Sequence, residues 1–196
     1  LVAASKTQNS DAVLAAFEAG VQLFGESRVQ ELEQKAPLLP QAQWHFIGAL
    51  QRNKARRAVE LCSLIHSLDS LRLGEVLDRL GSERGQPVRA LVEVNLGGEA
   101  SKSGVALGEG EAFIEALAGR PGLRIEGLMT IPPPADAATT RAYFQRLAAL
   151  ARSLESRRFP QVAMHQLSMG MSEDFELAIE SGATLVRVGT AIFGPR

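Results

Sequence analysis

Short apolar runs alternate along the chain with longer segments that have helical spacing. Strand-like runs begin near eight positions: Leu1, Val21, Trp44, Ser63, Val88, Leu123, Val162 and Thr184. Helix-like segments lie between them, at residues 10–19, 27–35, 51–61, 70–80, 109–118, 136–155 and 171–180. This alternation is typical of βαβ units and a parallel sheet. Eight strands predict a closed α/β barrel of the (β/α)8 TIM type, with a doubly wound open sheet as the alternative.

The helix predicted over residues 136–155 is the clearest of these elements. Phe144, Leu147, Ala151 and Leu154 follow the spacing of one buried helical face, and Asp136 is a suitable N-cap. A barrel of this type usually has about 250 residues, with 200 near the lower limit. The 196 residues therefore predict one domain over 1–196 with short loops, lacking the helix that would precede the first strand. With no initiator Met, an N-terminal piece is expected to be missing.

Composition narrows the class of protein. Hydrophobic residues make up 45% and charged residues 22%, as in an ordinary globular domain. With 21 basic and 22 acidic side chains the net charge is −1, so we expect neither nucleic acid nor a membrane as a partner. The single Cys62 excludes a disulfide framework, and no apolar run approaches the roughly 20 residues that cross a bilayer. No signal peptide is evident, so we expect a cytoplasmic protein. Because the net charge is near zero and no apolar patch is obvious, we expect a monomer.

Candidate functional residues follow the strands at one end of the predicted barrel. Active sites of such barrels lie where the strands end, often with a phosphate site after strands seven and eight. Lys6 follows the first strand, Ser168 and Gly170 follow the seventh, and Gly189 and Thr190 follow the eighth. Because closure places the eighth strand beside the first, these residues are expected to converge on one shared ligand.

The residue types suit a ligand with a phosphate and a carbonyl group. Glycine turns let backbone N–H groups approach an anion, and hydroxyl groups donate hydrogen bonds to it. A lysine at the barrel mouth, with its pKa lowered by partial burial and cationic neighbours, can form a Schiff base. Arg187 could bind the phosphate or contact the ring nitrogen of a cofactor. In the second case its permanent positive charge would disfavour protonation of that nitrogen, so the ring would withdraw electrons less strongly from a bound substrate. Considered singly, each feature is more often a plain turn or a surface lysine.

Taken together, these segments resemble the pyridoxal phosphate homeostasis protein family, relatives of the N-terminal barrel of alanine racemase, over nearly the whole chain. The resemblance implies a barrel of the alanine racemase type, with pyridoxal 5′-phosphate (PLP) held as an internal aldimine on Lys6. It also implies Ser168, Gly189 and Thr190 around the phosphate, Arg187 toward the pyridine nitrogen, and no established turnover. The matching stretches are 4–7, 24–26, 29–31, 44–48 with 50–51 and 53–54, 101–104, 127–129, 167–172 and 187–194.

Two departures from related proteins bear on the site. Where the family commonly has Gly-Glu-Asn, this chain has Gly25-Glu26-Ser27, so we expect Ser27 to reach the cofactor through a bridging water. The chain also contains no counterpart of the racemase's second domain, which supplies an opposing tyrosine base. The only tyrosine, Tyr143, lies in a predicted outer helix and is interpreted as structural.

The three histidines fall within or at the end of strand-like runs. His45, His66 and His165 lack metal-ligand spacing, so we expect no metal and interpret them as hydrogen-bonding residues of the barrel interior or rim. His45, His165 and Met129 are further candidates for lining the pocket.

Two basic features have less specific interpretations. The cluster of residues 52–57 around Lys54 is interpreted as a solvated face, with a docking patch as the alternative. Lys102, in a glycine-rich loop, is interpreted as a surface lysine, with a role as a second amine that relays the cofactor as the alternative.

Three functions follow, in order of preference. The first is a binding protein for PLP and other B6 vitamers that buffers the free aldehyde and transfers it to apo-enzymes. The second is a PLP-dependent amino-acid racemase-like enzyme with Lys6 as one base. The third is a Schiff-base aldolase acting on a sugar phosphate. A carrier would be yellow and inert to amino acids, a racemase yellow and active on the α-proton, and an aldolase colourless.

Overall fold

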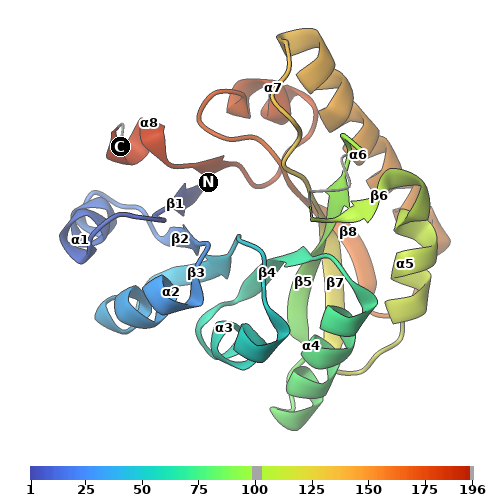
Figure 1. Cartoon of the computed structure of the whole chain (residues 1–196), viewed down its shortest axis with the longest axis horizontal. Helices are drawn as coiled ribbons and strands as arrows, with labels where there is room; N and C mark the ends of the chain where they lie inside the picture. Colours follow the sequence, from blue (N-terminus) through green and yellow to red (C-terminus); the bar gives the residue numbers. More distant parts are fainter. Residues whose placement is uncertain (99–102, 195–196) are drawn as a thin grey trace.

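A parallel β-sheet rolled into a barrel forms the centre of the computed structural model, which describes residues 1–98 and 103–194 (Figure 1). The hydrogen-bonded strand order is β8-β7-β5-β4-β3-β2-β1-β9, with β6 beside β5, and every pair is parallel. The strands are β1 (Val2–Ala4), β2 (Leu23–Glu26), β3 (Gln43–Phe46), β4 (Leu64–Leu68), β5 (Val88–Asn95), β6 (Val105–Ala106), β7 (Leu123–Met129), β8 (Val162–Ser168) and β9 (Arg187–Val188).

Residues 184–187 join the two ends of this strand order and close the barrel. A parallel bridge pairs Ser168 of β8 with Leu185, and the Arg187 N–H donates to the Gly170 carbonyl over 2.9 Å. Strand β9 then pairs with β1. The predicted (β/α)8 barrel is therefore confirmed, and the short strand β6 is an addition that the hydrophobic pattern did not predict.

Each helix predicted from the sequence is present, although several begin later than expected. In Figure 1, helices α1 to α7 surround the strands in chain order. The helices are α1 (Ser10–Glu18), α2 (Val29–Lys35), α3 (Ala55–Leu61), α4 (Leu71–Glu83), α5 (Gly110–Leu117), α6 (Ala137–Arg157), α7 (Phe175–Glu180) and α8 (Thr190–Phe193), with 3-10 turns η1 (Ala36–Leu38), η2 (Arg52–Lys54) and η3 (Leu107–Glu109).

Side-chain caps set the first residues of three helices. The Asp136 carboxylate accepts a hydrogen bond from the Thr139 N–H at the start of α6, over 2.8 Å, as predicted. Asn9 and Ser70 cap α1 and α4 in the same way. Because these acceptors satisfy N–H groups that lack partners within the helix, they favour helix initiation at these positions.

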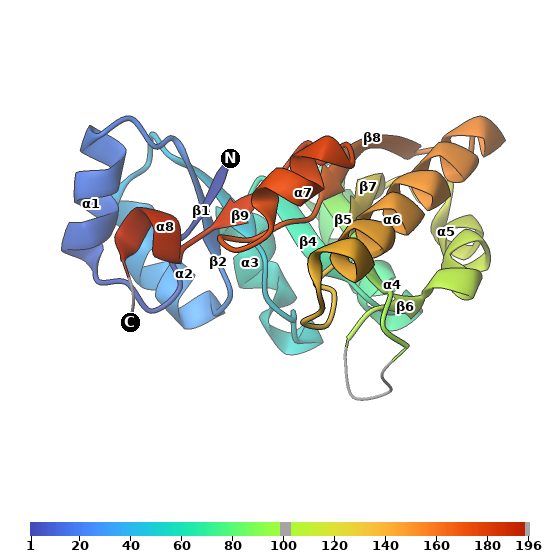
Figure 2. The same cartoon turned by 90° about the horizontal axis from the view of Figure 1, so that it is seen from above.

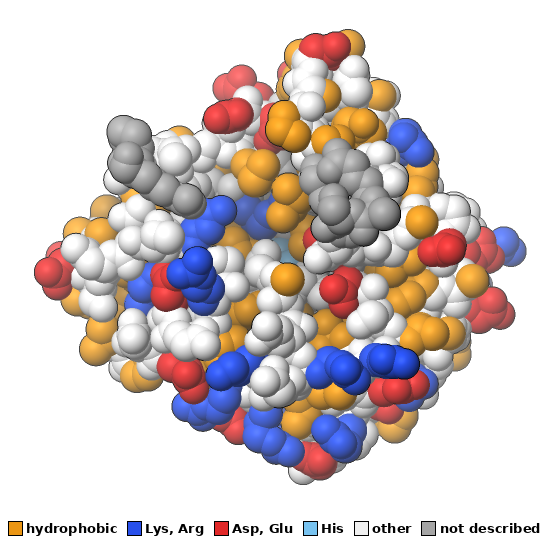
Figure 3. All heavy atoms as spheres, viewed as in Figure 1, with side chains coloured by type: hydrophobic (Ala, Val, Ile, Leu, Met, Phe, Trp, Pro, Cys, Tyr) orange, Lys and Arg blue, Asp and Glu red, His pale blue; other side chains and the backbone are white. Residues whose placement is uncertain are grey.

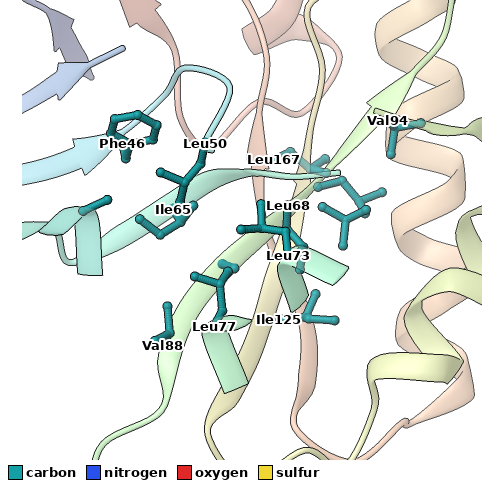
Figure 4. Packing of buried hydrophobic residues seen from close by; sticks show 14 of the residues in the cluster. Phe46, Leu50, Ile65, Leu68, Leu73, Leu77, Val88, Val94, Ile125 and Leu167 are labelled. Carbon is teal, nitrogen blue, oxygen red and sulfur yellow. The ribbon is translucent and has the colours of Figure 1, made fainter. Parts of the chain in front are cut away.

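Hydrophobic side chains form a large core between the strands and the helices, and a small cluster inside the barrel. Figure 4 shows part of the outer core, in which Ile65 and Ile125 from the strands lie near Leu73 and Leu77 of α4. The predicted face of α6 packs into the same core. The inner cluster consists of Leu64, Leu91 and Met129, with Leu185 packed against it.

The carboxyl ends of the strands meet on one side of the barrel. The loop after β7, residues 130–136, projects from the same side as α8, as Figure 2 shows. None of the helices in the described part of the chain is long and apolar enough to cross a membrane.

Replacement of Gly127 by alanine is expected to destabilise the barrel. Gly127 has φ +152° at a register shift in β7, and a Cβ atom there would lie 1.8 Å from the Gln166 carbonyl oxygen of β8. The strands would have to separate, so the free energy of unfolding in urea should fall by roughly 2–4 kcal/mol. Gly108→Ala is the control, because its Cβ would meet no atom within 4 Å. Equal stability of the two variants would contradict the proposed strand contact.

Candidate functional site

A cavity of about 510 Å³ lies at the carboxyl ends of the strands. Its volume is within the range of about 300–1,000 Å³ that small-molecule sites occupy. In the face shown in Figure 3, a histidine side chain is visible near the centre, among Lys or Arg and hydrophobic side chains. Five of the predicted site residues line the cavity: Lys6, Ser27, Arg187, Gly189 and Thr190.

Lys6 lies in the turn between β1 and α1, and the backbone on both sides of it is held by carboxylates. The Ser5 hydroxyl donates to Glu26 Oε1 over 2.7 Å, and the Thr7 N–H donates to Glu31 Oε2 over 2.8 Å. Thr7 has φ +66°, in the left-handed region, which these contacts help to maintain. Lys6 itself is exposed, so the partial burial expected from the sequence is wrong: the turn lies at the open mouth of the barrel.

Glu26, Glu31 and Lys35 form a cluster between β2 and α2 that we call the anchor cluster. Lys35 Nζ donates to Glu26 Oε1, Glu31 Oε2 and the Ser5 carbonyl, over 2.7, 2.9 and 2.9 Å. The side chains of Lys35 and Glu26 are only 5% and 0% exposed. Burial raises the pKa of Glu26, against the opposing effect of the hydrogen bonds from Lys35 and Ser5. The cluster therefore fixes the turn that carries Lys6 but engages every donor of Lys35.

Arg187 is a buried cation in the wall of the cavity. Its Nη1 donates to Ser168 Oγ over 2.6 Å, and its Nη2 donates to the Thr130 carbonyl over 2.8 Å. Burial lowers its pKa to about 10, although the charges of Glu93 and Asp174 act in the opposite direction. In the described part of the chain, no carboxylate lies within ion-pair distance of it. A buried guanidinium that contacts only neutral acceptors favours an anionic or hydrogen-bond-accepting ligand.

Two histidines continue the contacts of Arg187 into the barrel interior. His66 Nδ1 lies 2.9 Å from Ser168 Oγ, and His66 Nε2 lies 2.9 Å from His45 Nδ1. Burial lowers the pKa of His45 to about 4, assisted by the charge of Arg89, and burial holds the pKa of His66 well below its ordinary value. Both imidazoles are therefore neutral at neutral pH, as expected for interior hydrogen-bonding histidines.

The turn after β9 presents backbone N–H groups to one hydroxyl group. The N–H groups of Gly189 and Ala191 donate to Ser172 Oγ over 3.2 and 3.4 Å. A Cβ atom on Gly189 would lie 3.2 Å from the Ala4 carbonyl oxygen, so the absence of a side chain allows β9 to approach β1. Gly189 and Ser172 line the cavity, and backbone N–H groups and hydroxyls of this kind bind phosphate oxygens.

Five other predicted site residues do not line the cavity. Ser168 lies below it, because its hydroxyl contacts Arg187 and His66 in the barrel interior. Gly170 is buried where the barrel closes, and His45 and Met129 lie deeper inside. His165 is exposed, 3.9 Å from Glu126, so its expected place in the pocket is wrong: alternation along β8 directs it away from the cavity.

Sequence reasoning missed several residues that the structure brings to the site. Ser172 belongs to a quoted motif, but nothing in the sequence distinguished it from Ser168 as the hydroxyl beside Gly189. Pro132, Pro133 and Pro134, to which the sequence analysis assigned no role in the site, line the cavity. The anchor cluster had no sequence signal beyond three charged residues near the second strand.

The structure describes the basic cluster of residues 52–57 but not Lys102, the two basic features noted in the sequence. Within residues 52–57, Arg56 pairs with Glu83, and Arg57 pairs with Glu33 and Glu60, as in a solvated face. Lys102, the candidate second amine, lies outside the described residues.

Comparison with known proteins gives concordant results over the whole chain. The profile of the alanine racemase N-terminal domain matches residues 2–196. Curated relatives named pyridoxal phosphate homeostasis protein include that of Pseudomonas aeruginosa, 44% identical over 100% of this chain and 84% of the relative. That of Vibrio alginolyticus is 40% identical over 100% and 86%. The structure of PipY from Synechococcus elongatus with PLP bound superposes with a TM-score of 0.91 at 40% identity, covering 99% of this chain and 92% of that one.

Loss of Lys35 is expected to destabilise the fold. In Lys35→Met the buried Glu26 carboxylate loses its cation, so the free energy of unfolding should fall by about 3–5 kcal/mol. In the control Arg56→Met an exposed pair with Glu83 is lost, and the cost should stay below about 1 kcal/mol. Urea unfolding of both variants measures the difference. An equal decrease in the free energy of unfolding would contradict a larger stabilising contribution from the buried cluster than from the exposed pair.

The stability contribution of His45 is expected to depend on pH. Its pKa is about 4 in the folded chain and 6.5 in the absence of burial, so the unfolded state binds more protons between these values. The contribution is complete above pH 6.5 and is lost as the pH falls to 4, by about 3 kcal/mol. The pKa of Glu93, raised by burial to about 7, gives the opposite slope.

A single pH curve therefore does not isolate His45. His45→Asn keeps an acceptor near the Nδ1 position and removes the titrating ring. The stability difference between wild type and His45→Asn should shrink by about 3 kcal/mol between pH 7 and pH 4. A constant difference across this range would contradict the lowered pKa.

Proposed function

This chain belongs to the alanine racemase N-terminal domain family, and on that premise we propose that it holds PLP as a Schiff base on Lys6 and serves in intracellular vitamin B6 homeostasis. The observation that carries the proposal is the convergence of Lys6, Arg187 and the Gly189–Thr190 turn on one cavity. An amine, a buried cation and a set of backbone N–H donors are together what an anionic aldehyde requires.

The residues of the cavity have separate roles in this proposal. The Lys6 amine lies on a turn fixed by the anchor cluster, so its position is set although its side chain is exposed. The Gly189 N–H, with the hydroxyls of Ser172 and Thr190, receives the phosphate. Arg187 supplies donors at the buried wall, and Ser27 contacts the ligand through water. Lys6 would hold the cofactor covalently, because PLP, when bound, would supply an aldehyde carbonyl with which a lysine amine can condense with loss of one water.

A carrier function is favoured over a racemase. Two-base racemisation needs a second acid or base on the opposite side of the ligand. Tyr143, the single tyrosine of the chain, packs against the hydrophobic core from α6 and does not line the cavity. In addition, the fixed positive charge of Arg187 opposes protonation of a ring nitrogen and so weakens the electron sink that carbanion chemistry needs.

Transfer to apo-enzymes fits the position of Lys6 at the mouth. Because Lys6 is exposed, an incoming amine could replace it in the C=N bond and carry the ligand away as a new imine, or water could hydrolyse the bond and release the aldehyde; either route would free the Lys6 amine. The same openness admits other B6 vitamers that carry an aldehyde. We propose that this occurs in the cytoplasm, where the free thiol of Cys62 is compatible with a reducing environment, and by a monomer without nucleic-acid or membrane partners.

Addition of PLP to the purified chain should produce the visible absorbance of a Schiff base, absent in Lys6→Ala. Borohydride reduction followed by peptide mass mapping should place the adduct on Lys6. Lys54→Ala is the control, because this lysine lies on the surface turn η2 away from the cavity and its loss should leave the spectrum unchanged.

Three other outcomes discriminate the alternatives. Absence of the band from wild type would contradict PLP binding and favour the sugar-phosphate aldolase. An adduct on a different lysine would contradict the role of Lys6. Exchange of the α-proton of alanine by the loaded protein would favour the racemase-like enzyme.

A further inference from the structure

Four polar side chains form a continuous chain through the barrel interior, beginning at the cavity wall. Arg187, Ser168, His66 and His45 come from β9, β8, β4 and β3, and are 4%, 0%, 0% and 6% exposed. The contacts between neighbours are 2.6, 2.9 and 2.9 Å long. The first member lines the cavity and the other three do not. The interior residues can therefore act on a ligand only through Arg187.

The chemistry of Arg187 fixes the direction of the first two hydrogen bonds. A guanidinium has donors and no acceptor, so Ser168 Oγ must accept from Arg187. The Ser168 hydroxyl proton then needs an acceptor of its own, because a buried donor without one is costly. Among the described residues, His66 Nδ1 is the acceptor within reach.

The same reasoning fixes both imidazole tautomers. A neutral His66 that accepts at Nδ1 carries its proton on Nε2, and this proton is donated to His45 Nδ1. His45 therefore carries its own proton on Nε2. The hydrogen bonds run in one direction from Arg187 to His45, because each residue donates a proton to an acceptor atom of the next.

We propose that His66 is a positioning residue that, through Ser168, holds the Arg187 guanidinium in the cavity wall by this one-directional chain ending on His45. The proposal rests on the proposed function, since it concerns the cation that faces the bound cofactor there. Neutral acceptors are the significant feature of the arrangement. A carboxylate in place of Ser168 would neutralise Arg187, whereas a hydroxyl and two neutral imidazoles orient it and leave its charge for the ligand.

The tautomers can be measured on the full chain without any ligand. The protein contains three histidines, so long-range 1H–15N spectra of 15N-histidine-labelled protein near neutral pH hold three imidazoles. His45→Asn and His165→Gln assign them, and the exposed His165 is the internal reference. We expect Nε2 protonated and Nδ1 unprotonated in both His45 and His66. A proton on His66 Nδ1, or averaged tautomers for the pair, would overturn the proposal.

Two substitutions of His66 test its effect on the ligand. His66→Asn keeps an acceptor near the Nδ1 position, whereas His66→Leu removes it. We expect the Kd for PLP to rise about tenfold in His66→Leu and to stay within about threefold of wild type in His66→Asn. His165→Leu is the matched control, a histidine outside the chain of hydrogen bonds, and should bind as wild type does.

The outcomes separate this inference from the proposed function. If wild type forms the adduct with PLP on Lys6, and His66→Leu and His66→Asn both bind PLP with the Kd of wild type, the positioning role is overturned and the function stands. If wild type binds no PLP, the function fails, and so does a role for His66 toward that ligand, whatever the tautomers. If His66→Leu does not fold, the wild-type tautomers together with the affinity of His66→Asn decide.

Discussion

The pairing of β9 with β1 is the interaction on which the site depends. It joins the two ends of the strand order, with Val2 opposite Arg187 and Ala3 opposite Val188. Lys6 follows β1 by two residues, and Gly189 follows β9 directly, so this pairing brings the amine and the N–H donors to one mouth. The close approach of Gly189 to the Ala4 carbonyl shows how little space the pairing leaves. A side chain at that position would act on the fold and on the ligand site together.

The interior of this barrel contains both apolar and polar side chains, and the two kinds have different packing requirements. The cluster of Leu64, Leu91 and Met129 needs only to fill space. The polar members need partners, because an unsatisfied buried donor or an unpaired buried charge is costly. Arg187 obtains them from a hydroxyl and a carbonyl, which accept from both terminal nitrogens and leave the positive charge in place. Among the described residues, no carboxylate lies within ion-pair distance of this cation at the cavity wall, although the charges of Glu93 and Asp174 act on it from farther away.

The sequence predicted the architecture well, because strand and helix periodicities and the Asp136 cap are local properties. It also predicted that Lys6 and the Gly189–Thr190 turn would converge, since barrel closure alone places the first and last strands together. Ser168 and Gly170, expected at the same ligand, do not line the cavity. The sequence did not separate Ser172 from Ser168, because which of two hydroxyls faces the cavity depends on where β8 ends. It offered His165 as a candidate for lining the pocket. The side chain is instead exposed, because the register of β8 is set by pairing with β7 and cannot be deduced from the local sequence.

Lys35 and Lys6, two lysines near the site, show why contacts, and not residue type, decide which amine can react. Lys35 is buried, and its ammonium donates to two carboxylates and a carbonyl, so all three of its protons are engaged. To attack a carbonyl it would have to lose a proton and leave Glu26 uncompensated in the interior. Among the described residues, no carboxylate forms an ion pair with the Lys6 amine, and Lys6 lines the cavity. The cluster that makes Lys35 unreactive also fixes the turn of Lys6, so one lysine positions the other.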